Sequence, residues 1–246
     1  MKRFKWQILL GISFIIASAV LYLIQIEVFH DERATFFYLL QDIAFIPIQV
    51  LLVTLVLNQL LKMREKLAML NKMNMVIGTF FSEVGAGLLR FFAGYDHAAD
   101  ALRKDLMVTG QWSDQQFSEA ARVVSNYDFR IDYEQTDLVA LKSLLTGKRD
   151  FLLRLLENPN LLEHETFTEL LWAVFHLTEE LAVRDNLTEL TPPDGNHIAG
   201  DIKRAYALLI TEWLAYMKHL KSEYPYLFSL ALRMNPFDRH ASAVVQ

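Results

Sequence analysis

The stretch from Trp6 to Ile26 contains no charged residue. A helix of this length is roughly 30 Å long, which is enough to cross the hydrocarbon core of a bilayer. A second uncharged run extends from Ile43 to Leu61, and it reaches back to about residue 35 if Asp42 is included. The two runs predict a transmembrane hairpin with spans at about 6–26 and 35–61.

A short polar turn, residues 30–33, lies between the two spans. The basic residues that flank the hairpin lie on its outer sides, at Lys2, Arg3, Lys5, Lys62, Arg64 and Lys66. Because basic residues favour the cytoplasmic side, both termini are predicted to be cytoplasmic. This arrangement predicts an integral protein of the bacterial inner (plasma) membrane. The alternative is a cleaved signal peptide with a site at residues 17–19, but the apolar run continues to Ile26 and a second span follows.

A stripe with alternating spacings of three and four follows the second span and continues beyond it. Its members are Leu39, Asp42, Ile46, Gln49, Val53, Val56, Leu60, Met63, Leu67, Leu70, Asn74, Ile77, Phe81, Val84, Leu88 and Phe91. Such a heptad seam is typical of a coiled coil or a helical bundle. The sequence therefore predicts one helix, from about Phe36 to Phe92, that leaves the membrane and packs along this seam.

Three members of the seam are polar: Asp42, Gln49 and Asn74. Asp42 is interfacial if the span begins at Ile43, whereas Asp42 and Gln49 face a bundle interior or a pore if the span begins earlier. Asn74 is either a device that fixes the register of an assembly or an ordinary polar interruption. We therefore treat the three residues as candidates for a pore lining or an assembly seam.

Residues 62–236 are predicted to form one cytoplasmic helical domain, followed by a tail at 237–246. About six or seven helices are expected, so the fold class is all-α. After the helix that ends near Phe92, helical patterns occupy approximately residues 96–108, 113–126, 135–156, 163–186, 197–223 and 226–234. A break is expected at Thr146-Gly147, an extended connector at 127–134, and a loop at 191–195.

Charge and cysteine content exclude several classes of protein. The net charge is −5, and residues 1–61 hold equal numbers of basic and acidic side chains. The acidic excess therefore lies in the helical domain, which has no basic block and is not expected to bind nucleic acid. There is no cysteine, so disulfides, thiol nucleophiles and thiolate metal sites are excluded.

One helix face carries the best candidate for a partner-binding or metal-binding surface. Its members are Glu165, Glu169, Trp172, His176 and Glu180. Oxygen and imidazole ligands suit a metal ion, but a single helix cannot close a coordination sphere, and a solvated face is the alternative. Trp172 among glutamates indicates a covered face. His197 and Asp201, one turn apart, are interpreted as a local pair that serves helix capping and solubility.

No catalytic motif and no cofactor motif is present in the sequence, so no catalytic residue and no cofactor is predicted. The preferred function is a self-associating interaction or regulatory module that is anchored in the membrane and binds a cytoplasmic protein. The alternative is a homo-oligomeric ion-conducting pore or transport protein lined by the second transmembrane helix. Both functions require the lipid bilayer and a homo-oligomer.

Overall fold

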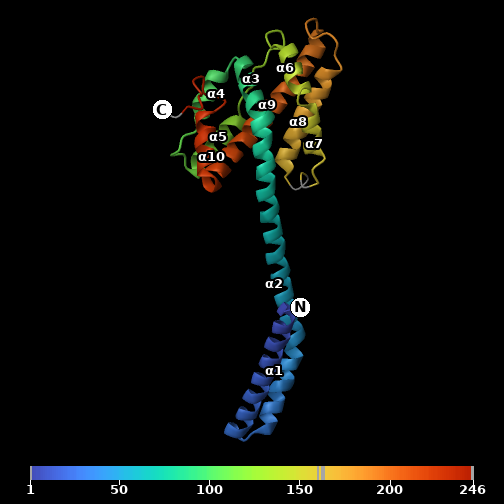
Figure 1. Cartoon of the computed structure of the whole chain (residues 1–246), viewed down its shortest axis with the longest axis vertical. Helices are drawn as coiled ribbons and strands as arrows, with labels where there is room; N and C mark the ends of the chain where they lie inside the picture. Colours follow the sequence, from blue (N-terminus) through green and yellow to red (C-terminus); the bar gives the residue numbers. More distant parts are fainter. Residues whose placement is uncertain (1, 160, 162–163, 245–246) are drawn as a thin grey trace. The chain divides into compact units, whose positions relative to one another are not determined.

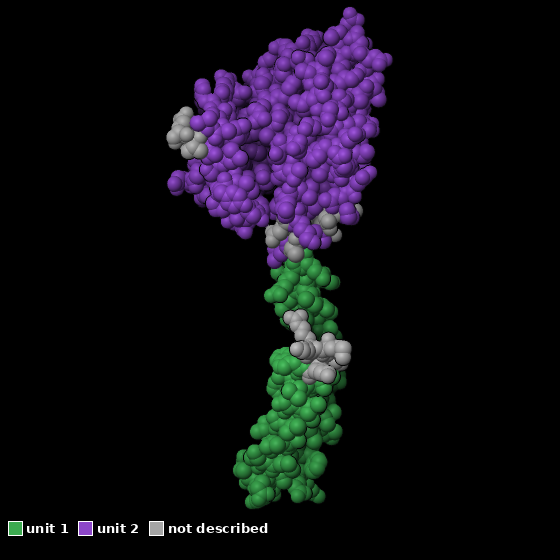
Figure 2. Space-filling model, in the orientation of Figure 1, with its two compact units in different colours: residues 1–65 green, residues 66–246 purple. Residues whose placement is uncertain are grey.

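A computed structural model of the chain describes residues 2–159, 161 and 164–244 (Figure 1). The structure is 78% helical, and the described residues contain no strand. The extended connector predicted at 127–134 forms a single antiparallel β-bridge, between Ile131 and Asp96. The predicted all-α class is confirmed. The chain divides into two compact units, residues 1–65 and 66–246 (Figure 2).

The first unit contains α1 (Lys2–Phe29) and the beginning of α2 (Glu32–Phe80). The chain reverses at His30, which has a positive φ of 51°, and the carboxylate of Asp31 accepts the N–H of Ala34 at 2.9 Å. By length and composition alone, both helices could cross a membrane. None of the residues in either apolar window is buried within the chain.

The end of α2 leads into a π-helical turn, η1 (Phe81–Gly85), and then into α3 (Ala86–Tyr95). The segment predicted as one helix from Phe36 to Phe92 is therefore helical throughout, but not uniformly α-helical. A Cβ atom at Gly85 would lie 2.6 Å from the ring of Phe81, so glycine leaves the space that this ring occupies. A π-turn adds one residue to a helical turn and changes which side chains face the core.

The long helix α9 (Pro192–Glu223) lies at the centre of the second unit and contacts α3, α5, α8 and α10 (Figure 1). Aromatic rings pack around it: Tyr206 of α9 meets Phe92 and Phe129 with ring centroids 5.6 and 5.0 Å apart. The C-terminal part of the heptad seam, Ile77 to Leu88, is buried in the same core. These seam positions are therefore covered by the chain's own helices.

The remaining helices of the second unit follow the predicted pattern closely. They are α4 (Ala99–Asp105), α5 (Asp114–Ser125), α6 (Leu138–Thr146), α7 (Arg149–Leu156), α8 (Glu165–Ala182) and α10 (Pro225–Arg233). The break predicted at Thr146-Gly147 is confirmed, since it separates α6 from α7. Within the described part of residues 62–236, the end of α2 is followed by eight α-helices, more than the six or seven helices expected in all, because this break and the π-turn each divide a predicted helix.

The loop predicted at 191–195 is wrong, because α9 begins at Pro192. Proline is well suited to the first turn of a helix, where its missing N–H would have no partner and its fixed φ is helical. Gly195 is a buried helical residue, and a Cβ atom there would lie 2.3 Å from the ring of Tyr133. The glycine is therefore required by close packing rather than by a turn.

Two smaller differences concern single residues. Asp96 opens the helical pattern predicted at about 96–108, and aspartate is a favoured N-cap residue, but Ala98 is the N-cap residue of α4. The buried Asp96 carboxylate instead accepts hydrogen bonds from the Tyr127 hydroxyl and the backbone N–H of Ala98. The segment predicted as a tail begins inside the fold. Phe237 is buried and its ring meets that of Trp213 at 5.2 Å.

Candidate metal centre

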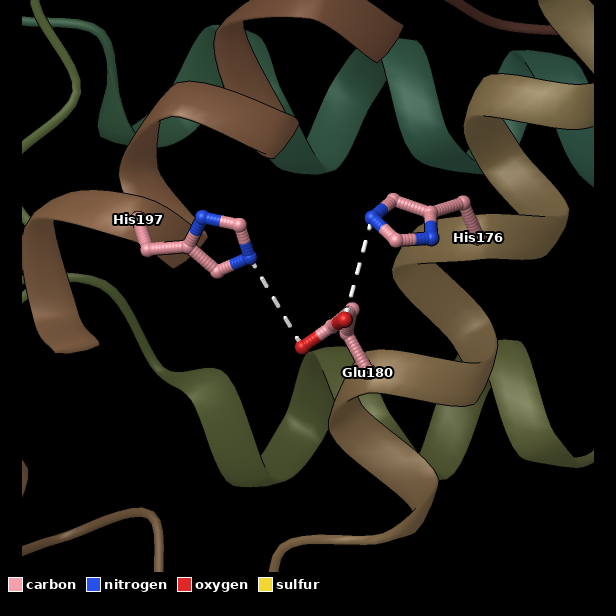
Figure 3. A group of neighbouring side chains, drawn as sticks. All are labelled: His176, Glu180 and His197. Carbon is pink, nitrogen blue, oxygen red and sulfur yellow. Dashed lines mark ion pairs between the residues drawn. The ribbon is translucent and has the colours of Figure 1, made fainter.

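The helices α8 and α9 each present one histidine and one carboxylate, four residues apart, toward the other helix. His176 and Glu180 lie on α8, and His197 and Asp201 lie on α9. Residues four apart share one face of a helix, and the two helices pack against each other. Figure 3 shows both imidazole rings directed at the carboxylate of Glu180 from opposite helices.

Short distances join each of the two histidines to both carboxylates. The Nε2 atoms of His176 and His197 each lie 3.4 Å from the same oxygen, Oδ2 of Asp201. The same two nitrogens lie 3.8 Å from the Oε1 and Oε2 atoms of Glu180, respectively. One ligand atom from each of His176, Glu180 and His197 lies within 4.8 Å of the other two.

Asp201 is the most buried member of the cluster, with only 3% of its side chain exposed. Its Oδ2 atom is buried and has no hydrogen-bond partner. A buried carboxylate oxygen without a donor is costly, and such an atom in a folded protein is commonly explained by a water molecule or an ion. The two histidine side chains are about half exposed, at 46% and 52%. The cluster is thus buried at Asp201 and open to solvent at the two histidines.

Two arginines hold the carboxylates from outside the cluster. Arg204 Nη2 lies 3.2 Å from Asp201 Oδ1, and Arg184 Nη1 donates to Glu180 Oε2 at 2.6 Å. Arg184 also donates to both carboxylate oxygens of Asp194, in the first turn of α9. The hydrogen bond from Arg184 lowers the pKa of Glu180, despite partial desolvation. Both carboxylates of the cluster are therefore oriented, and Glu180 is held in its charged form.

The sequence identified half of this cluster. His176 and Glu180 were predicted on one helix face, but His197 and Asp201 were interpreted as a capping pair. The local pairing of His197 with Asp201 is confirmed, but the capping role is wrong, because α9 begins at Pro192 and places His197 more than one turn inside the helix. A single helix cannot complete a coordination sphere, but α9 adds two further candidate ligands to those of α8. The paired spacings, His-x-x-x-Glu and His-x-x-x-Asp on two predicted helices, were the available signal.

The other residues of the predicted face lie on α8, N-terminal to His176. Glu165 and Glu169 are exposed, and Trp172 is 57% exposed. Glu169, Trp172 and His176 line a surface groove of about 680 Å³ with Arg204 and Leu208 of α9. The expectation that a partner covers Trp172 stays a prediction.

The three polar seam residues do not lie together. Asp42 accepts a hydrogen bond from the Tyr22 hydroxyl of α1 at 3.4 Å, and Gln49 is exposed. Asn74 lies in the second unit, where its side-chain amide nitrogen is 3.2 Å from Nδ1 of His219. Asn74 therefore has a partner within its own chain, and a role of the three residues in an oligomer stays a prediction.

The fold and this cluster define a class: an all-helical protein whose C-terminal helical domain brings two histidines and two carboxylates together. A family model described as the N-terminal helical domain of MJ1433 matches residues 2–61, and one described as the C-terminal helical domain of the uncharacterized protein MJ1433 matches residues 69–233. The chain is 45% identical over 234 residues to the uncharacterized protein MJ1433 of Methanocaldococcus jannaschii, which covers 95% of this chain and 94% of that protein. The chain belongs to this family. No solved structure matches it.

Proposed function

We propose that the chain is an integral membrane protein whose helical domain is a cytoplasmic, self-associating interaction or regulatory module. The observation that carries this proposal is the exposure of the apolar side chains in α1 and in the first part of α2. None of the residues in either apolar window is buried by the chain itself. A bilayer removes such side chains from water, and apart from the bond lost at Pro47 of α2, helices satisfy their own backbone hydrogen bonds, as a membrane segment must.

The distribution of basic residues supports the proposed orientation. Basic side chains precede the first apolar run and follow the second, whereas the turn between the helices carries only Arg33. This asymmetry supports a cytoplasmic location for both ends of the hairpin, and for residues 62–236, because basic residues favour the cytoplasmic side of a plasma membrane.

The absence of native cysteine allows a clean test of this topology. We would introduce single cysteines as Glu32→Cys in the turn and Ala243→Cys near the C-terminus, both at exposed positions. Intact cells are treated with a membrane-impermeant maleimide. Glu32→Cys is expected to react in intact cells, and Ala243→Cys only after lysis. Labelling of Ala243→Cys in intact cells, or extraction of the unlabelled protein by alkaline carbonate, would contradict the proposal.

Self-association is proposed to use the part of the seam that the chain does not cover. Leu60, Met63 and Leu67 are all exposed large apolar residues on the same stripe. An apolar stripe of this kind is normally covered by another helix. The groove beside Trp172 is the proposed surface for a cytoplasmic protein partner, because a tryptophan next to charged side chains is typical of interface anchors.

Disulfide crosslinking in membranes tests the seam. Leu67→Cys places a thiol on the seam, whereas Glu65→Cys places one about 160° away around the helix. Both residues follow the proposed span and both native side chains are exposed, so the two variants form a matched pair. Mild oxidation is expected to give a covalent dimer for Leu67→Cys and little for Glu65→Cys. Equal yields from the two variants would rule out a specific seam.

A homo-oligomeric pore is the second proposal, and the exposure of Asp42 and Gln49 favours it. The two residues are seven apart on one helix face and lie within an apolar sequence. Carboxylates arranged around an axis would select cations. Reconstituted vesicles should then show cation flux that is lost in Asp42→Asn and retained in Glu27→Gln, which removes a carboxylate from α1. Absence of flux in the native protein would exclude the pore.

A further inference from the structure

We propose that His176, Glu180, His197 and Asp201 bind one divalent first-row transition metal ion, of the kind represented by Zn²⁺, Mn²⁺ or Fe²⁺. This inference goes beyond the proposed membrane function and does not depend on it, since all four residues lie in the second unit. Imidazole favours zinc and iron, and carboxylate favours manganese and other hard ions, so the mixed set suits this class of metal.

The distances match those of a metal site. Bonds of about 2.1 Å place neighbouring ligands of a tetrahedral ion about 3.4 Å apart. Each histidine Nε2 atom lies 3.4 Å from Asp201 Oδ2, and the nitrogen-to-Glu180 distances are 3.8 Å. The two histidines and Asp201 therefore already lie at ligand spacing, whereas Glu180, whose two distances involve different oxygens, must move closer to ligate the same ion.

The buried oxygen of Asp201 is the second, independent observation. Oδ2 approaches two imidazole nitrogens at the same distance but makes a hydrogen bond with neither. A simple histidine–aspartate pair would satisfy this oxygen with one directed N–H bond. A metal ion satisfies it without such a bond, because the oxygen and both nitrogens donate electron pairs to the same ion.

The outer contacts leave the required atoms available. Arg204 contacts Oδ1 of Asp201, which leaves Oδ2 directed at the imidazoles. Arg184 contacts Oε2 of Glu180, which leaves Oε1 beside His176. Partners of this kind orient ligating carboxylates in metal sites. The ion would join α8 to α9, and the half-exposed histidines leave one side open to solvent.

The test is metal binding by the full chain in detergent micelles. Protein stripped with a chelator is dialysed against Zn²⁺ alone or Mn²⁺ alone, and bound metal is measured by elemental analysis. We expect about one ion per chain for the native protein. Asp201→Asn and His197→Gln are each expected to raise the Kd about tenfold or more, since even outer contacts of a metal site are worth 10–100-fold. Glu189→Gln, which alters an exposed carboxylate outside both the cluster and the groove, is the matched control and should not change the Kd.

A thermal shift gives a second measurement that does not rely on counting ions. A metal that binds the folded state at a hundredfold excess over its Kd should raise the Tm of the native domain by about 5–10 °C. The shift should be absent in His197→Gln, whose half-exposed side chain is not needed for folding. Substoichiometric binding by the native protein, or equal Kd values for the native protein and His197→Gln, would overturn the proposal, and would do so even if Asp201→Asn fails to fold.

Discussion

The hairpin and the helical domain both consist of helices rich in large apolar residues, but these side chains are exposed in the hairpin and buried in the helical domain. Leu52 in α2 is 55% exposed, whereas Leu141 in α6 is fully buried. In the helical domain, leucines and aromatic residues pack around α9. In the hairpin, the chain covers almost none of them.

This difference shows that apolar content alone does not indicate a core. The hydrophobic effect favours the transfer of apolar surface from water to any apolar environment, whether this is a protein core or lipid. Other helices of the same chain replace the water in the helical domain. In the hairpin the proposed replacement is lipid, so contacts within the chain should contribute little there. The first prediction below compares the two units directly, and the others test whether the stability of the helical domain depends on specific contacts.

The largest effect is expected from removing apolar volume in the two units. Leu141→Ala should lower the free energy of unfolding of the helical domain by about 2–5 kcal/mol, because the buried site cannot collapse fully. Leu52→Ala should change it by less than about 0.5 kcal/mol. Denaturant unfolding in micelles, followed by the fluorescence of the buried Trp213, measures both. A comparable loss from Leu52→Ala would show that the hairpin has a core of its own.

A smaller effect is expected from adding one methyl group at two glycines of α9. Gly195→Ala places a Cβ atom 2.3 Å from the ring of Tyr133, whereas no atom lies within 4 Å of a Cβ at Gly200. Gly195→Ala should destabilise the domain by about 1–3 kcal/mol through overpacking. Gly200→Ala should stabilise it by about 0.4–1 kcal/mol, because alanine is the better helix former. Equal effects on the Tm would argue against tight packing at the start of α9.

The capping box of α5 should contribute about 1 kcal/mol. Ser113 accepts the N–H of Gln116, and the Gln116 side chain accepts the N–H of Ser113 at 2.7 Å. Ser113→Ala removes the hydrogen bond from the Gln116 N–H to the Ser113 hydroxyl and should lower the free energy of unfolding by about 1 kcal/mol. Ser118→Ala lies within the same helix and should be close to neutral, because its hydroxyl bonds only to the preceding turn. If Ser118→Ala lowers the free energy of unfolding more than Ser113→Ala does, the capping box is not the main stabilising feature at the start of α5.

The smallest effect should be a dependence on pH near neutrality. Burial lowers the pKa of His219 from its ordinary 6.5, and Glu223 opposes this shift. The unfolded chain therefore takes up a proton first, so the contribution of His219 to stability is present above pH 6.5 and falls as the pH is lowered toward the depressed value. His219→Gln should flatten the Tm curve between pH 7 and 5, and the exposed His240→Gln should not. If the Tm of His219→Gln depends on pH as steeply as that of the native protein, His219 is not the source of the pH dependence.

The predicted helices could be identified because their causes are local. The Ser113 capping box, the Thr146-Gly147 break and the end of α9 before Pro225 all depend on neighbouring residues. The start of α9 was missed because the same residues, two prolines, an aspartate and a glycine, suit both a loop and the first turn of a helix. The ring of Tyr133 against Gly195 separates the two possibilities, and that contact is distant in sequence.

The amino-acid sequence is enough to show that this chain is helical, that its first part is unusually apolar, and that two pairs of histidine and carboxylate occur at a spacing of four. Helical periodicity and local capping are short-range properties, so they can be read from neighbouring residues. The contact of His176 and Glu180 with His197 and Asp201, and the burial of Asp201 between them, become visible in the folded chain. The packing of α8 on α9 sets that contact, and packing depends on the shapes of many side chains at once.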